Sequence, residues 1–153
     1  MSTIMEVVID FEYLKGRQDE MVVKELSVAS ENVSDSFRFE RTYDMMSNGS
    51  GANGLNSTDI HIPYYKLYTV ATEAVAGFPH FHAYGDEKWK YLAELLGRPI
   101  HNLKDLECPA PSFFNHRRWC SLPCHKFPNI HYATKTAHSL FDWTMNHLQT
   151  NLM

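Results

Sequence analysis

The feature that most constrains the fold is the short apolar run Glu6-Val-Val-Ile-Asp-Phe11 near the start of the chain. Its β-branched residues and near lack of polar ones are typical of a strand that is covered on both faces of a sheet. Such a strand needs helices packed on each side, so the run predicts an α/β domain. The carboxylate pair Asp10-x-Glu12 marks the end of this strand.

Two further strand patterns follow the first one. Residues 21–29 predict a strand with Val22, Leu26 and Val28 on one face, and with Val23, Glu25 and Ser27 on the other. Residues 35–43 alternate aromatic and polar side chains, which predicts a third strand with one solvated side. Three successive strands joined by short turns indicate an antiparallel meander.

The rest of the chain alternates helical patterns with short strands. We expect a helix that begins at Pro63 and ends before Gly77, a strand over 78–84, a helix over 87–96 opened by Asp86, a strand over 100–103 and a helix over 134–148. The predicted element order is therefore β-β-β-α-β-α-β-α.

Length and composition predict a single domain that spans residues 1–153. Within it, residues 46–58 predict a mobile loop, and the Cys-, His- and Pro-rich residues 108–131 predict an irregular segment. A net charge of -4 gives no indication of a broad basic face for duplex nucleic acid, so we expect any nucleic-acid contact to be local. Three cysteines, the lack of a secretion signal and the lack of a long apolar run predict an intracellular protein, cytoplasmic or nuclear, without a membrane partner.

The pair Asp10 and Glu12 is the first candidate site. Two residues apart on a strand, the side chains leave the same face, roughly 6.5 to 7 Å apart along the chain. Carboxylates at this spacing can share hard cations such as Mg²⁺ or Mn²⁺, although a strand end in water would carry the same pattern.

The element order and these acids resemble the RNase H-like fold and its DnaQ-type (DEDDh) 3′-5′ exonucleases. Asp10 and Glu12 match the first motif, Asp86 matches a second acid, and His131-Tyr-Ala133-Thr-Lys-Thr136-Ala137 matches the last motif. The resemblance implies metal binding by the three acids, with His131 as general base on the attacking water. Thr136 stands where the family has a metal-binding Asp, which predicts that catalysis is lost.

A second resemblance is to transposon-associated arthropod proteins and to the Maelstrom domain of the same nuclease lineage. The segments that carry it are Val23-Lys-Glu25-Leu, Ile62-Pro-Tyr64, Gly85-Asp-Glu-Lys88 and residues 133–143. Maelstrom has a Glu-Cys-His-Cys zinc site in place of the catalytic acids. Glu25 and His116 match its Glu and His, whereas Phe113 and Tyr132 stand where its cysteines would be.

A different zinc site is conceivable in the irregular segment. The pattern H-x3-C-x3-C-H gathers four candidate ligands, His116, Cys120, Cys124 and His125. Thiolates and imidazoles suit tetrahedral Zn²⁺, but buried free cysteines and solvent-facing histidines would give the same pattern. Among them, Arg117, Arg118 and Trp119 combine guanidinium groups with an aromatic face, which suits single-stranded nucleic acid or packing within the domain.

Three functions fit these patterns. The first is a nuclease-derived, catalytically degenerate domain that binds nucleic acid or a protein partner, in a mobile-element or viral context. The second is an active Mg²⁺- or Mn²⁺-dependent 3′-5′ exonuclease in which an acid such as Asp142 replaces the one lost at Thr136. The third is a zinc-stabilised protein-interaction module.

Overall fold

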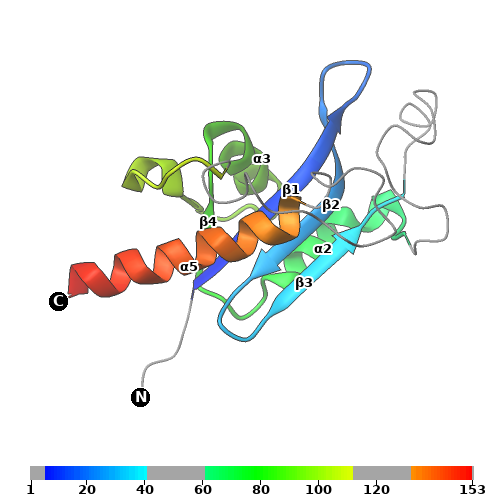
Figure 1. The fold of residues 1–153 in the computed structure, drawn as a ribbon. Coiled ribbons are helices and arrows are strands. Elements are labelled where there is room, and N and C mark those ends of the chain that lie inside the picture. The colour runs from blue at the N-terminus through cyan, green and yellow to red at the C-terminus, as the bar shows by residue number, and fades with distance from the viewer. Residues whose placement is uncertain (1–5, 41–60, 112–131, 153) are drawn as a thin grey trace.

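A computed structural model describes residues 6–40, 61–111 and 132–152. They form an α/β fold, in which a five-stranded mixed sheet carries helices on both faces (Figure 1). The strands are β1 (Glu6–Lys15), β2 (Met21–Ala29), β3 (Ser34–Arg38), β4 (His80–Ala83) and β5 (His101–Asn102). The helices are α2 (Leu67–Ala74), α3 (Asp86–Leu96) and α5 (Tyr132–Leu152), with 3-10 turns η1 (Tyr64–Lys66) and η2 (Leu103–Leu106).

The strands lie in the order β3-β2-β1-β4-β5. The first three form an antiparallel meander, whereas β4 runs parallel to β1 and β5 runs parallel to β4. The predicted meander and the predicted order of strands and helices are thus confirmed. The apolar run of β1 is explained by its central place in the sheet, where both of its faces are covered.

The first strand is longer than predicted. It pairs with β4 only through Glu6, Val7 and Val8, but it pairs with β2 as far as Lys15. The strand therefore continues as one arm of a hairpin that reaches beyond β4 (Figure 1). Asp10 and Glu12 consequently lie within β1, just past the end of its pairing with β4, and not at the end of the strand.

A β-bulge changes the faces of β2. Glu12 pairs with Glu25 and Tyr13 pairs with Val23, so Lys24 is an extra residue on β2. An extra residue reverses the alternation of side chains beyond it. Val23 therefore joins Leu26 in the core on the α2 side of the sheet, and the prediction that Val23 shares a face with Glu25 is wrong.

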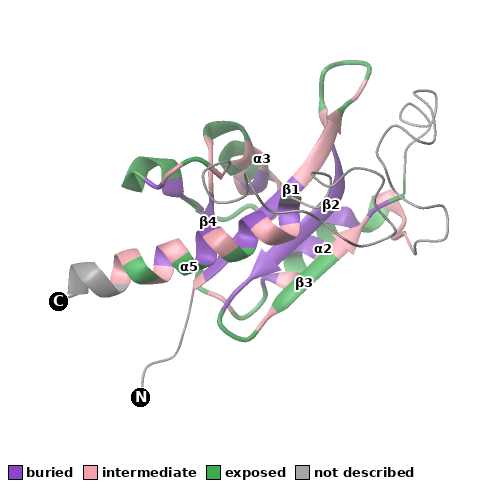
Figure 2. Cartoon of the chain, viewed as in Figure 1, coloured by how far each residue is buried: buried purple, intermediate pink, exposed green. Residues whose placement is uncertain are grey.

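Two apolar layers hold the sheet between the helices. Figure 2 shows β2 and the first half of β1 as mostly buried. The larger layer lies between the sheet and helices α2 and α3, and includes Val7, Ile9, Phe11, Val23, Leu26, Val28, Leu67, Ala71, Phe81 and Leu92. The smaller layer lies under α5, and includes Val8, Ala29, Leu103, Cys108, Ala137, Leu140 and Phe141. The helix α5 contributes Ala137, Leu140 and Phe141 to this layer.

The other predicted boundaries shift by a few residues. The third strand ends at Arg38, and Phe39 then forms an isolated parallel bridge with Ile62. The predicted loop 46–58 and residues 112–131 of the predicted irregular segment lie outside the described residues. Within the described part of the chain, no helix is both long enough and apolar enough to cross a membrane.

Candidate functional site

The candidate site begins at Asp10, a buried carboxylate of β1. Its side chain is 3% exposed, and its Oδ1 accepts a 2.9 Å hydrogen bond from Nζ of Lys88 on α3. Burial raises the pKa of Asp10, and the positive charge of Lys88 opposes that rise. Burial would lower the pKa of Lys88, but the charge and hydrogen bond of Asp10 outweigh it and raise that pKa. A distance of 2.9 Å is typical of an ion pair with a charge-assisted hydrogen bond, so we treat both groups as charged.

Two more carboxylates lie on the same face of the sheet. Glu12 follows Asp10 by two residues, and Glu25 lies directly opposite Glu12 on β2. Burial raises the pKa of Glu12 to about 7, with the charges of Asp10 and Glu25 adding to the shift. Burial likewise raises the pKa of Glu25. Like charges placed opposite each other on two strands destabilise a sheet, so this face needs cations.

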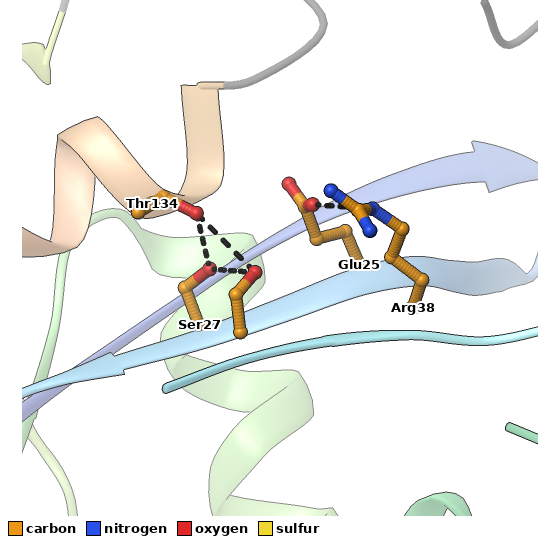
Figure 3. A network of polar contacts seen from close by, with 5 residues as sticks. Glu25, Ser27, Arg38 and Thr134 are labelled. Carbon is orange, nitrogen blue, oxygen red and sulfur yellow. Dashed lines mark hydrogen bonds and ion pairs between the residues drawn. The ribbon is translucent and has the colours of Figure 1, made fainter. Parts of the chain in front are cut away.

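Cationic side chains surround these acids. Nε of Arg38 on β3 lies 3.5 Å from Oε2 of Glu25, whose side chain is 4% exposed (Figure 3). The bulge residue Lys24 is buried beside the same group, where its charge lowers the pKa values of Glu12 and Glu25 against the effect of burial. Together with Lys88, these cations give the acidic face one positive charge for each carboxylate.

A cluster of hydroxyl groups joins α5 to this face. Oγ of Ser27, opposite Asp10 in the sheet, lies 3.0 Å from Oγ of Ser36 and 3.2 Å from Oγ1 of Thr134 (Figure 3). Thr134 also donates to Ser36 over 3.2 Å. The cluster fixes the start of α5 next to the acids.

Asp86 is the first residue of α3 and follows the carboxyl end of β4. Its side chain contacts Asn102 and Lys104, not the acids of β1 and β2. Oδ1 of Asp86 accepts a 2.9 Å hydrogen bond from Nδ2 of Asn102, and its Oδ2 lies 3.5 Å from Nζ of Lys104. The Oδ1 atom of Asn102 in turn accepts a 3.0 Å hydrogen bond from the backbone N–H of Gly85. Gly85 has a φ of 97°, a conformation that glycine adopts far more readily than other residues. Asn102 therefore fixes the turn that leads into α3.

An open cleft of about 370 Å³ lies at this edge. Its lining comes from β1 and from the segments that follow β4 and β5, and comprises Tyr13, Tyr84, Gly85, Asp86, Glu87, Lys88, Lys104 and Pro111. In α/β sheets, ligands bind outside the carboxyl ends of the parallel strands, which is where this cleft lies. Its aromatic rings and ammonium groups suit a planar group joined to an anion.

The side chains present do not fit a divalent metal ion well. Asp10 is paired with Lys88, and Asp86 is turned toward Asn102 and Lys104. Within residues 6–40, 61–111 and 132–152, no group of three His, Cys, Asp or Glu side chains is arranged to hold one ion. Metal binding by Asp10, Glu12 and Asp86 therefore stays a prediction that this geometry does not favour.

The helix α5 supplies no replacement acid to this face. Thr136 is buried at 3% exposure, in the position where the exonuclease resemblance would place an Asp. Asp142 is exposed, whereas its neighbours Leu140 and Phe141 are buried against the sheet.

The remaining predicted site residues lie outside the described residues. They are the predicted general base His131, the candidate zinc ligands His116, Cys120, Cys124 and His125, and the candidate nucleic-acid contacts Arg117, Arg118 and Trp119.

A separate histidine cluster lies on the β4–β5 pair. Nε2 of the buried His82 lies 2.7 Å from Oε1 of Glu6, and the His82 ring stacks on His101 with 5.0 Å between ring centroids. Burial lowers the pKa of His82, and the hydrogen bond and charge of Glu6 oppose that shift. This cluster ties β1, β4 and β5 together.

Sequence patterns missed the cations that balance the acids. Lys88 lies two residues after Asp86, in the first turn of a predicted helix, and this position at the sheet edge was the available signal. Arg38 and Lys24 could not be assigned from the pattern, because the bulge that sets the faces of β2 leaves no sequence signature.

Comparison of the chain with models of protein families, with characterised proteins and with solved structures gives no match.

Proposed function

We propose that this chain is an RNase H-like domain of nuclease descent that binds the end of single-stranded nucleic acid without hydrolysing it. The fold part of the proposal is supported by the element order and by the mixed sheet with helices on both faces. The observation that carries the loss of hydrolysis is the ion pair between Asp10 and Lys88, which places an ammonium group beside the first acid of the nuclease-like motif.

The cleft supports binding. Tyr13 and Tyr84 offer aromatic faces on which an unpaired base can stack, and stacking of this kind tolerates any base. Lys104 is 56% exposed at the cleft and can meet a phosphate. Lys88 has three N–H donors, of which one is bound to Asp10, so it can also reach a phosphate in the cleft.

The charge balance limits the length of nucleic acid that can bind. Asp86 and Glu87 also line the cleft, although Asp86 lies next to Lys104 and Oε2 of Glu87 lies 3.8 Å from Nζ of Lys15. With a net charge of -4 over the whole chain, an extended backbone would be repelled. The geometry therefore favours a terminal nucleotide with one or two phosphates over a long tract.

Fluorescence anisotropy of labelled single strands of DNA and RNA tests this proposal. We expect binding that Lys104→Ala weakens about tenfold, since a charge-assisted hydrogen bond of about 1.5 kcal/mol would be lost. Lys66→Ala removes an exposed lysine of η1 outside the cleft and is the matched control, for which we expect no change. The slope of log K against log salt should be about −1, as for one or two phosphate contacts.

Two results would contradict the proposal. Equal weakening by Lys104→Ala and Lys66→Ala would show that binding does not use the cleft. An absence of measurable binding to either kind of strand at low salt would end the nucleic-acid assignment altogether.

A further inference from the structure

The ammonium group of Lys88 is held at a fixed position beside Asp10, as a bound cation would be. The ammonium group lies 2.9 Å from a carboxylate oxygen that is almost fully buried, and the Lys88 side chain itself is 25% exposed. The ring of Phe11 lies below it, with its centroid 5.4 Å from Nζ. The first turn of α3 and this aromatic ring together hold the charge in one place, so Lys88 is not a loosely placed surface side chain.

The surroundings explain why a cation is needed there. Asp10, Glu12 and Glu25 lie on adjacent strands of one sheet face, with Glu12 directly opposite Glu25. Buried carboxylates without compensating charges are strongly unfavourable. Glu25 is a buried carboxylate with such compensation: the Arg38 charge, 3.5 Å away as an ion pair, and a Ser36 hydroxyl oppose the rise that burial causes in its pKa.

Three acids at this spacing would normally suit a hard divalent cation, which prefers carboxylate oxygens and retained waters. Here the cations are side chains of the chain itself, and the nearest to Asp10 is Lys88. A metal ion that approached Asp10 would meet the positive charge of the half-buried Lys88 and would have to displace it.

We propose that the Lys88 ammonium group is the built-in cation of the Asp10–Glu12 pair, and that it excludes divalent metal ions from these carboxylates. It follows that removal of Lys88 converts the pair into a site for Mn²⁺ or Mg²⁺. This inference rests on the same ion pair as the proposed loss of hydrolysis. Its test measures metal binding in the absence of nucleic acid, so its failure leaves the proposed binding of single strands untouched.

The test compares Mn²⁺ binding by four forms of the chain, each purified free of metal: the unmodified chain, Asp10→Asn, Lys88→Met and the double variant Asp10→Asn/Lys88→Met. Lys88→Met keeps an unbranched side chain over Phe11 but removes the charge. In equilibrium dialysis and in thermal unfolding with millimolar Mn²⁺, we expect no Asp10-dependent binding to the unmodified chain. We expect Lys88→Met to bind about one Mn²⁺ and to unfold several degrees higher when Mn²⁺ is present.

The double variant Asp10→Asn/Lys88→Met is the matched control. It lacks both charges of the pair, and we expect it to lose the Mn²⁺ binding and the metal-dependent rise in unfolding temperature that Lys88→Met gains. Equal Mn²⁺ binding by the single and double variants would overturn the proposal, because the ion would then lie elsewhere.

The behaviour of Lys88→Met alone and of the unmodified chain also tests the proposal. A folded Lys88→Met that binds no Mn²⁺ overturns the proposal, and so does Mn²⁺ binding by the unmodified chain that Asp10→Asn abolishes. If Lys88→Met does not fold without metal, recovery of its circular dichroism spectrum in Mn²⁺ supports the proposal. A failure to recover at millimolar Mn²⁺ overturns it, because metal would then be unable to take the place of Lys88.

Discussion

At the scale of single residues, Glu12 links the acidic face to the stability of the fold. Its carboxyl group ionises near pH 4.5 in an unfolded chain, whereas its pKa in the folded protein is about 7. Between these values the folded state binds more protons than the unfolded state, so this residue lowers stability as the pH rises from 4.5 to 7. Above pH 7 the loss of stability caused by the ionised Glu12 has reached its full size.

Replacement of Glu12 by Gln should therefore stabilise the protein at pH 8. We expect a gain on the order of 1–3 kcal/mol in the free energy of unfolding, and a gain that fades as the pH falls toward 4.5. Urea unfolding at a series of pH values measures the size of the gain and its dependence on pH. Glu73→Gln, at an exposed position of α2, is the matched control, for which we expect less than about 0.5 kcal/mol. A Glu12→Gln variant that is no more stable than this control at pH 8 would contradict the assignment of the raised pKa.

The same scale shows what sequence could and could not predict about the site. Asp10 and Glu12 were recognisable because a two-residue spacing on a strand puts both on one face, and the structure places them so. Their partners were harder to recognise, and the only signal for Lys88 was its place in the first turn of a predicted helix. Lys88 is distant in sequence from Asp10, and its role depends on how α3 meets the edge of the sheet, which is set by tertiary packing.

At the scale of elements, the turn between β4 and α3 positions Lys88. Asn102 receives the N–H of Gly85 and donates to Asp86, so a single buried amide on β5 connects the end of one strand to the start of a helix. The left-handed Gly97, with a φ of 63°, ends the same helix. The helix α3 is therefore fixed at both ends by backbone chemistry.

We expect Asn102→Ala to destabilise the protein by about 1–3 kcal/mol, because it leaves the half-buried N–H of Gly85 without its acceptor. Chemical denaturation measures this loss. Asn32→Ala, in the exposed turn between β2 and β3, is the matched control and should change stability by less than about 0.5 kcal/mol. If both variants are equally stable, Asn102 does not hold the start of α3.

The bulge at Lys24 is the element that sequence reasoning could not foresee. Alternation of polar and apolar residues predicts faces correctly only while each residue has one partner. Since β2 gains one residue relative to β1 between Glu25 and Val23, the pattern fails at that point and holds on either side of it. Glu25, which pairs with Glu12, is the residue of β2 that directly follows the bulge residue Lys24.

At the scale of the whole molecule, the order of strands and helices was predictable from apolar periodicity, glycines and prolines. The strong signals were the central strand β1, the helix stop at Gly97 and the apolar face of α5. Pairing was harder to predict, because the length of β1 beyond β4 depends on the hairpin that it forms with β2. The candidate site depends on that geometry, since β1 runs past the end of its pairing with β4 and leaves Asp10 within reach of Lys88 on α3.

The most direct test of a domain that binds but does not cut is an incubation of end-labelled single strands with the protein and Mn²⁺, with Asp10→Asn as the control. We predict strands of unchanged length on a sequencing gel for both forms of the protein, under conditions in which anisotropy shows the unmodified protein to be bound. Progressive shortening from the 3′ end by the unmodified protein, abolished in Asp10→Asn, would contradict this prediction and would make the chain an active exonuclease.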